Sequence, residues 1–181
     1  MNTLPAKYCF DQNLMPGCFI AVGAGPVVEA RATSFTSPAN TSHTVTNPSG
    51  IAANDLLIYA FSNNATSTVT WPAGVTSLGT TTCPASVCRL SLAYRYANGG
   101  EGASITVTTS GAQVASALAW RISNAEDPAN RVPTLSAAAT GNSGAPDSVS
   151  VAPSDGAVAW LWLSIVGVDG VGALTAPTSY T

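Results

Sequence analysis

Four cysteines have the most distinctive spacing in this chain, and they fall into two local pairs, Cys9 with Cys18 and Cys83 with Cys88. Neither pair has the C-x2-C spacing of a zinc site, and the one histidine, His43, is far from both in sequence, so we predict no metal site. Two interpretations stay open. Each pair closes a short loop as a disulfide, or all four are free thiols buried as small hydrophobic side chains.

Groups able to act in acid–base catalysis are sparse, since the chain has one histidine and nine acidic residues. Segment 141–144 (GNSG) faintly resembles a nucleophile loop, but a triad would need His43 as its base and one of the scattered acids as its orienting group. Segment 126–128 (EDP) is the only acidic cluster, and a solvated turn explains it more simply than a pair of glycosidase carboxylates. We therefore predict a protein that is not an enzyme and has no cofactor.

The charge composition and the length of the apolar runs predict that this chain neither binds nucleic acid nor spans a membrane. Only 8% of the residues are charged and 46% are hydrophobic, whereas about 25% of residues are charged in ordinary soluble domains. Six Lys and Arg residues, scattered singly, form no basic stripe for phosphates, so nucleic acid is not expected. The most apolar run, 157–168, is shorter than the roughly 20 residues that span a bilayer, so no membrane span is expected.

The elements that would position these residues are predicted to be short strands. Residues 89–96 place large side chains at every second position, which is the period of a strand with one buried face. Segments 103–109 and 114–122 have the same period, and the short connections between the three runs predict antiparallel hairpins. Segments 56–61 and 157–166 are apolar on both faces, which predicts central strands.

The whole pattern predicts an all-β fold. No long amphipathic pattern of helical period occurs, and strand signals return about every ten residues, which is typical of an antiparallel β-sandwich, here of jelly-roll type, over residues 31–181. Residues 1–30 have no clear period and are predicted to form an extended N-terminal arm. Candidate contacts of this arm with a partner are its apolar and aromatic residues Tyr8, Phe10, Leu14, Phe19 and Ile20.

A weak internal repeat of one sequence pattern predicts that residues outside this sequence, or from another subunit, complete the fold. Asp55 and Asp155 each open a hydrophobic strand that is followed by a Pro-x-x-apolar-Thr pattern. We interpret both aspartates as acceptors of turn hydrogen bonds. Paired strands follow the first copy but not the second, so we expect a truncated chain or one completed by a neighbouring subunit.

Five segments, in this order, resemble a β-sandwich module of tailed-phage virion proteins. They are residues 54–60 (NDLLIYA), 71–76 (WPAGVT), 92–97 (LAYRYA), 105–108 (ITVT) and 119–122 (AWRI). In such modules a Gly-Asp-Leu-Leu strand, a Pro-x-Gly turn, a Tyr-Arg-x-Ala strand and a hydrophobic-Arg-Ile-Ser strand recur. The order of the motifs is more specific than any one of them.

The resemblance covers about residues 31–181 and departs from the pattern at two positions, Asn54 in place of glycine and Val75 in place of an aromatic residue. It implies a non-enzymatic virion structural protein, such as a capsid decoration protein or a head or tail fibre component. Its implied partners are other virion proteins and copies of itself. The arm, residues 1–30, lies outside the resemblance and would be the attachment segment.

Aromatic residues support an alternative function, a carbohydrate-binding module acting in host-receptor recognition. Tryptophans and tyrosines on a sheet face are typical stacking platforms for glycans. However, Trp120, Trp160 and Trp162 lie in apolar strands, and Tyr94 and Tyr96 share a predicted face with two leucines. These positions favour the core, so glycan binding is the second hypothesis.

Overall fold

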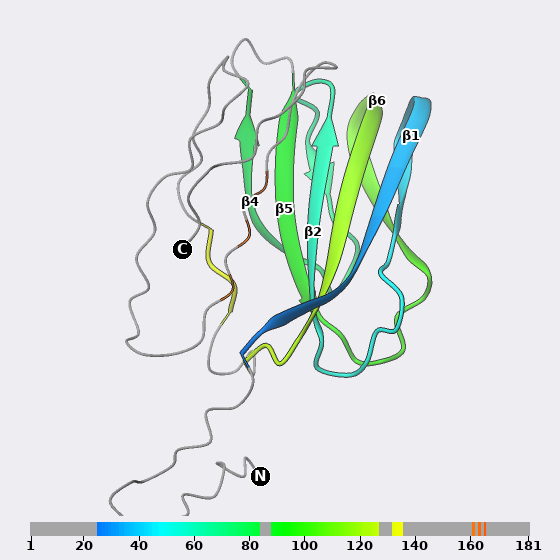
Figure 1. The fold of residues 1–181 in the computed structure, drawn as a ribbon. Coiled ribbons are helices and arrows are strands. Elements are labelled where there is room, and N and C mark those ends of the chain that lie inside the picture. The colour runs from blue at the N-terminus through cyan, green and yellow to red at the C-terminus, as the bar shows by residue number, and fades with distance from the viewer. Residues whose placement is uncertain are drawn as a thin grey trace, which may run out of the picture.

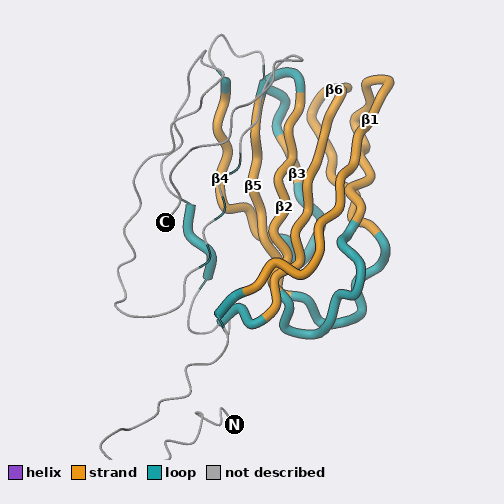
Figure 2. Tube along the Cα trace, in the orientation of Figure 1, coloured by secondary structure: helices purple, strands orange, loops and turns teal. Residues whose placement is uncertain are grey.

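A computed structural model describes residues 25–83, 88–126 and 132–135, together with residues 161, 163 and 165. Within these residues the chain forms strands and no helix, which confirms the all-β prediction (Figure 2). No helix in this part of the chain is long and apolar enough to cross a membrane. The strands are β1 (Val27–Thr46), β2 (Leu56–Asn63), β3 (Val69–Thr70), β4 (Thr76–Thr82), β5 (Arg89–Tyr96) and β6 (Ser104–Ser123).

The strands form one six-stranded sheet with the order β1-β6-β2-β5-β4, and β3 pairs with β6 off this path (Figure 1). All pairings are antiparallel. The bounds of β5 confirm the predicted strand 89–96. A division into two separate sheets and a jelly-roll connection are not confirmed, because the described strands make one continuous sheet.

The predicted hairpins are wrong. Segments 103–109 and 114–122 belong to one strand, β6, and β5 pairs with β2 and β4 rather than with β6. Ser110 and Gly111 do not end the strand, because the equally long β1 pairs with both halves of β6. The sheet also begins at Val27, so the last four residues of the expected arm belong to β1.

The paired β1 and β6 strands bend near their middle. The register shifts between Thr36 and Asn40 and again between Asn40 and Ser42, and irregularities of this kind bend a strand and increase its twist. Beyond the bend, the backbone N–H of Thr46 donates a hydrogen bond to Ser34 Oγ at 2.8 Å. The two halves of β1 therefore approach each other closely.

Because of this bend, both halves of β6 contribute to the same hydrophobic cluster, which we call the inner core. In the sheet, β2 lies between β5 and β6, which confirms segment 56–61 as a central strand. The side chains that the second half of β6 contributes to the inner core are alanines, which leave room for the rings of Tyr59 and Phe61 of β2. The buried residues of the inner core are Val45, Leu57, Tyr59, Phe61, Ala97, Ile105, Val107, Ala115, Ala117 and Ala119.

A smaller cluster, which we call the outer cluster, lies on the opposite face of the sheet, because alternate side chains of a strand point to opposite faces. Its buried residues are Ala60, Leu90 and Leu92, and Leu78, Leu118, Trp120 and Ile165 pack against them. The predicted core face of β5 is thus buried at its start, while Tyr94 and Tyr96 are half-buried. Of the predicted strand 157–166, the structure describes three residues, none of them in a strand.

One buried hydrogen-bond chain fixes the inner core to the loops that surround it. The Tyr59 hydroxyl donates to Asn47 Oδ1 at 2.8 Å, and Asn47 Nδ2 donates to the carbonyl of Gly102 at 2.8 Å. Burial raises the pKa of Tyr59 to about 12, so the hydroxyl remains a donor over the physiological range. These hydrogen bonds join β2, the end of β1 and the turn before β6.

Tyr59→Phe is expected to lower the free energy of unfolding by about 1–2 kcal/mol, because Asn47 Oδ1 loses its buried donor. The matched control is Tyr94→Phe, whose hydroxyl makes no hydrogen bond with the part of the chain that the structure describes, and whose effect should stay below about 0.5 kcal/mol. Urea unfolding at constant m-value measures both. Equal effects of the two substitutions would contradict the hydrogen-bond chain.

Candidate functional site

Arg121 of β6 ties the turn before β2 to the sheet. Its guanidinium lies 3.6 Å from the Asp55 carboxylate and 3.9 Å from that of Glu29, and it donates to the carbonyl of Gly50. Asp55 also accepts a hydrogen bond from the backbone N–H of Ala52 at 2.8 Å, which confirms its interpretation as a turn acceptor. The corresponding position, 155, lies outside the described residues.

Arg95 of β5 holds the turn between β5 and β6 in the same way. It lies 3.1 Å from the carboxylate of Glu101, whose side chain is buried. That carboxylate also accepts backbone hydrogen bonds from Asn98 and Gly99, both at 2.9 Å. Burial opposes ionisation of Glu101, but these hydrogen bonds and the charge of Arg95 outweigh it and hold its pKa below the usual value.

The two arginines lie at the same level of the sheet. Arg95 and Arg121 are both opposite Leu57, one on each neighbouring strand. Asn54, in the turn that Arg121 holds, has a left-handed backbone with φ of 71°, a conformation that glycine and asparagine adopt most readily. The segments that carry the family resemblance therefore supply turn and ion-pair residues rather than a set of reactive groups.

His43 is a buried core residue. Its ring packs edge-on against Phe61, with ring centroids 5.0 Å apart, and its Nε2 lies 2.9 Å from Thr109 Oγ1. The Thr109 hydroxyl donates its one hydrogen to the carbonyl of Gly111 at 2.8 Å, so it accepts from Nε2–H. Nδ1 then carries the lone pair, and it has no hydrogen-bond partner among the residues that the structure describes. Burial lowers the pKa of His43 below 6.5 and favours the neutral ring.

Within the described residues, the side chain bonded to the His43 ring is a threonine, and no carboxylate is bonded to the ring. The same residues contain no group of three or more His, Cys, Asp and Glu side chains that could hold a metal ion. The candidate nucleophile loop, 141–144, lies outside them, and of the acidic cluster 126–128 only Glu126 is described.

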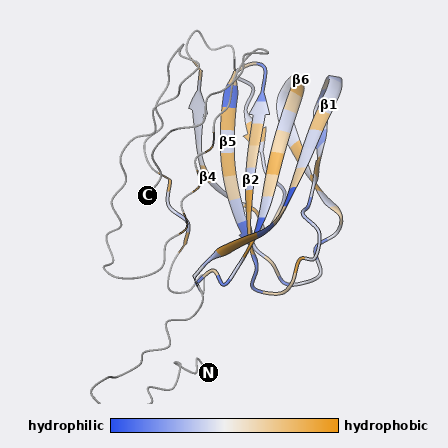
Figure 3. Ribbon diagram, in the orientation of Figure 1, coloured by the Kyte–Doolittle hydropathy of each residue, from blue (hydrophilic) through white to orange (hydrophobic). Residues whose placement is uncertain are grey.

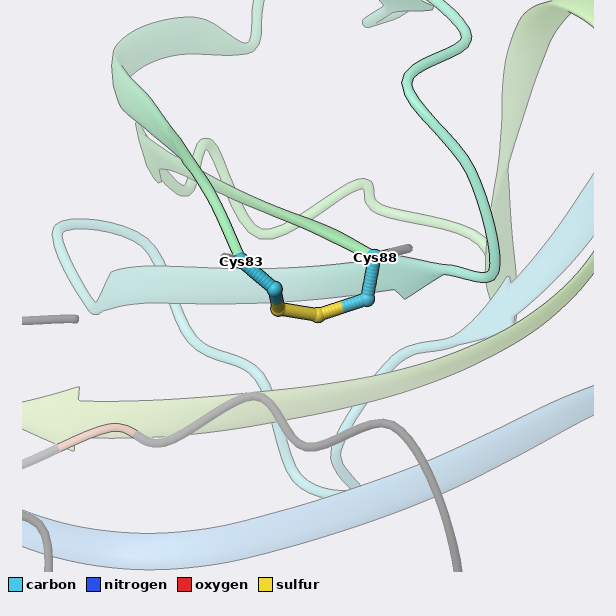
Figure 4. The surroundings of a disulfide bond; sticks show 2 residues. All are labelled: Cys83 and Cys88. Carbon is cyan, nitrogen blue, oxygen red and sulfur yellow. A yellow bond between two sulfur atoms is a disulfide. The ribbon is translucent and has the colours of Figure 1, made fainter. Parts of the chain in front are cut away.

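Cys83 and Cys88 are joined by a disulfide in the structure (Figure 4). Their Cα atoms are 5.2 Å apart, and the Cys83 N–H donates to the Cys88 carbonyl at 2.9 Å, so the bond closes the connection between β4 and β5. The candidate pair Cys9 and Cys18 lies outside the described residues. So do the candidate arm contacts Tyr8, Phe10, Leu14, Phe19 and Ile20.

The aromatic residues considered for glycan binding are dispersed. Trp71 packs against the inner core, with its ring centroid 6.2 Å from that of Tyr59, and Trp120 packs against the outer cluster. Tyr94 and Tyr96 form an edge-on pair with centroids 6.1 Å apart. Two further candidates, at positions 160 and 162, lie outside the described residues.

The first half of β1, residues 27–36, forms an edge of the sheet that the described residues make. Among the described strands β1 pairs only with β6, and this half carries three exposed large apolar side chains: Val27, Val28 and Phe35, which is 71% exposed. Figure 3 shows the beginning of β1 as hydrophobic. Edge strands are usually blocked by lysine, proline or inward charge, whereas this half has two charged residues and no lysine or proline. Sequence reasoning missed it, because few of its side chains are large enough to show the strand period.

No family model, curated protein or solved structure matches the chain. The resemblance to virion modules therefore has no independent match, and the virion role is a proposal. Of the surfaces in the described part of the chain, the open edge of β1 is the strongest candidate for a functional contact.

His43→Gln is expected to remove a loss of stability that begins below about pH 6.5. Because the pKa of His43 is lower in the folded state, the unfolded chain takes up the proton first as pH falls, and the free energy of unfolding decreases by at most about 1.4 kcal/mol per pH unit. Glu101, whose folded pKa is also lowered, loses its contribution only at more acidic pH, below 4.5.

Urea unfolding of both chains at about pH 7.5, 6 and 5 measures this difference. The control Tyr94→Phe should keep the wild-type pH dependence. If His43→Gln loses as much stability as the wild type across this range, His43 is not the group responsible.

Replacing both Cys83 and Cys88 with alanine is expected to lower the free energy of unfolding by about 2 kcal/mol, the loop-entropy value for a ring this short. A reducing agent should destabilise the wild type similarly and leave this double variant unchanged. Urea unfolding with and without reductant tests both statements. Equal stability of oxidised and reduced wild type would contradict a stabilising role of this bond.

Proposed function

We propose that this chain is a non-enzymatic structural protein of a tailed-phage virion, a capsid decoration protein or a head or tail fibre component. It is located in the virion, and its N-terminal arm, the part of residues 1–30 that precedes β1, anchors it to other virion proteins. The observation that carries the proposal is the open edge of β1, which follows the arm directly in the chain and exposes Phe35. Exposed apolar side chains on an unblocked edge are typical of surfaces that a protein partner covers.

The use of charge supports the same function. Four of the charged side chains described above, Arg95, Glu101, Arg121 and Asp55, are engaged in holding turns. The one histidine is enclosed in the core beside Thr109. A low-charge surface of this kind suits packing against other subunits, and the order of the resembling motifs points to virion proteins in particular.

A carbohydrate-binding module in host-receptor recognition is the second candidate. The observation that favours it is the pair Tyr94 and Tyr96, whose half-buried rings lie side by side on the outer face of β5. Aromatic rings on a rigid sheet can stack on sugar faces. Binding on a glycan array by a monomeric chain, lost on Tyr94→Ala with Tyr96→Ala, would favour this candidate over assembly.

Replacing the apolar arm residues Phe10, Phe19 and Ile20 with serine in the full chain is expected to lower its solution mass. The reason is that these side chains are the proposed contacts of the arm, and their burial drives association. Light scattering coupled to size exclusion measures the mass, and Gln12→Ser with Asn13→Ser is the matched control. A chain that is monomeric at all concentrations, with or without the arm substitutions, would contradict arm-mediated assembly.

A further inference from the structure

We infer that the first half of β1 pairs with the same segment of a second copy, antiparallel and about a two-fold axis at Thr33. The sheets of two chains then become one continuous sheet. This inference deepens the proposed function, on which its biological setting rests, by naming a second copy of the chain as a partner and β1 as the contact.

The backbone supplies the first argument. From Ala30 to Thr36, β1 pairs in unbroken register with β6 on one side, and on its other side no strand among the described residues pairs with it. Its outward N–H and C=O groups are therefore placed to extend the ladder. Pro38, which has no N–H, and the register shift beside it limit such pairing to the first half of β1.

Side-chain complementarity supplies the second argument. Arg31, Thr33 and Phe35 alternate along β1, so they share one face of the sheet, and all three are exposed. In an antiparallel pair centred on Thr33, Arg31 lies opposite Phe35 of the partner subunit, and symmetry makes this contact twice. A guanidinium over an aromatic face is an attractive pair. Arg31 makes no hydrogen bond or ion pair within the described part of the chain, so it is free for this contact.

Other two-fold registers fit less well. A centre on Arg31 places two guanidinium groups directly opposite each other, which is destabilising. A centre on Ala32 places Arg31 opposite threonine and Phe35 opposite a glutamate. The centre on Thr33 also matches small with small on the other face, where Ala32 lies opposite Ser34 of the partner subunit, and both are half-buried in one copy. Self-complementarity in this register is what favours a second copy over an unrelated partner.

Cysteine cross-linking in the full chain tests the register. A residue on the two-fold axis lies opposite itself, so Thr33→Cys should form a covalent dimer on mild oxidation, seen on a non-reducing gel. Thr41→Cys, an exposed threonine in the other half of β1, is the matched control, and the unmodified chain controls for the native cysteines. Thr33→Cys that cross-links no more than Thr41→Cys overturns the proposal.

Sedimentation of side-chain variants tests the contact. Arg31→Glu and Phe35→Ser should each weaken self-association at least tenfold, whereas Phe35→Trp should preserve it, because the larger ring keeps the cation–π contact. The 71% exposure of Phe35 means that these substitutions leave the core intact, which circular dichroism checks. Unchanged association in Phe35→Ser overturns the proposal.

The arm substitutions separate this inference from the proposed function. A Thr33→Cys cross-linked dimer that persists in the chain with the serine-substituted arm supports edge pairing even if arm-dependent assembly fails. Arm-dependent assembly without a Thr33→Cys cross-link keeps the proposed function and overturns edge pairing.

Discussion

The pairing of β1 with β6 along their whole length, with a bend in the middle, is the constraint on which the rest of the structure depends. The bend brings Val45 and Val107 from one half and Ala117 from the other into one cluster. Without it, the apolar face of β6 would be divided between two places, and neither half would enclose Tyr59 and Phe61. The alanines of β6 matter for the same reason, because larger side chains there would occupy the space of those rings.

The chain has few charged side chains, and two of its arginines form ion pairs that hold turns in place. Arg95 and Arg121 flank Leu57 on both sides, and each joins a turn to the end of a strand that packs on the inner core. In a partly buried setting a charged group needs a partner and hydrogen bonds, and the backbone amides of the turns supply them to Glu101. The motif residues that resemble virion modules thus have a clear structural use.

The edge strand β1 and its exposed apolar side chains connect this fold with protein–protein association. An edge strand whose outer backbone groups pair with no described strand, and which exposes Phe35, is typical of a surface that acquires a partner, whether another copy or another protein. The chain has few charged residues with which to prevent this, since only 8% of its residues are charged. The first half of β1 also follows the arm directly, so the same end of the chain can serve both anchoring and pairing.

The sequence by itself determined the local features. The period of two placed β5 at 89–96, the two-sided apolar run identified β2 as a central strand, and Asp55 was recognised as a turn residue. These features depend on side chains that are neighbours along the chain, so their pattern is visible in a single sequence.

Only the tertiary structure decided which strands pair, that 104–109 and 114–122 belong to one strand, and that β1 is an edge strand of the described sheet. It also decided between the two interpretations of Cys83 and Cys88, and it placed His43 against the inner core, beside Thr109 and Phe61. The physical reason is that every alternating strand offers the same backbone donors and acceptors. The choice of partner therefore depends on how distant side chains such as Tyr59 and Ala119 fill one core.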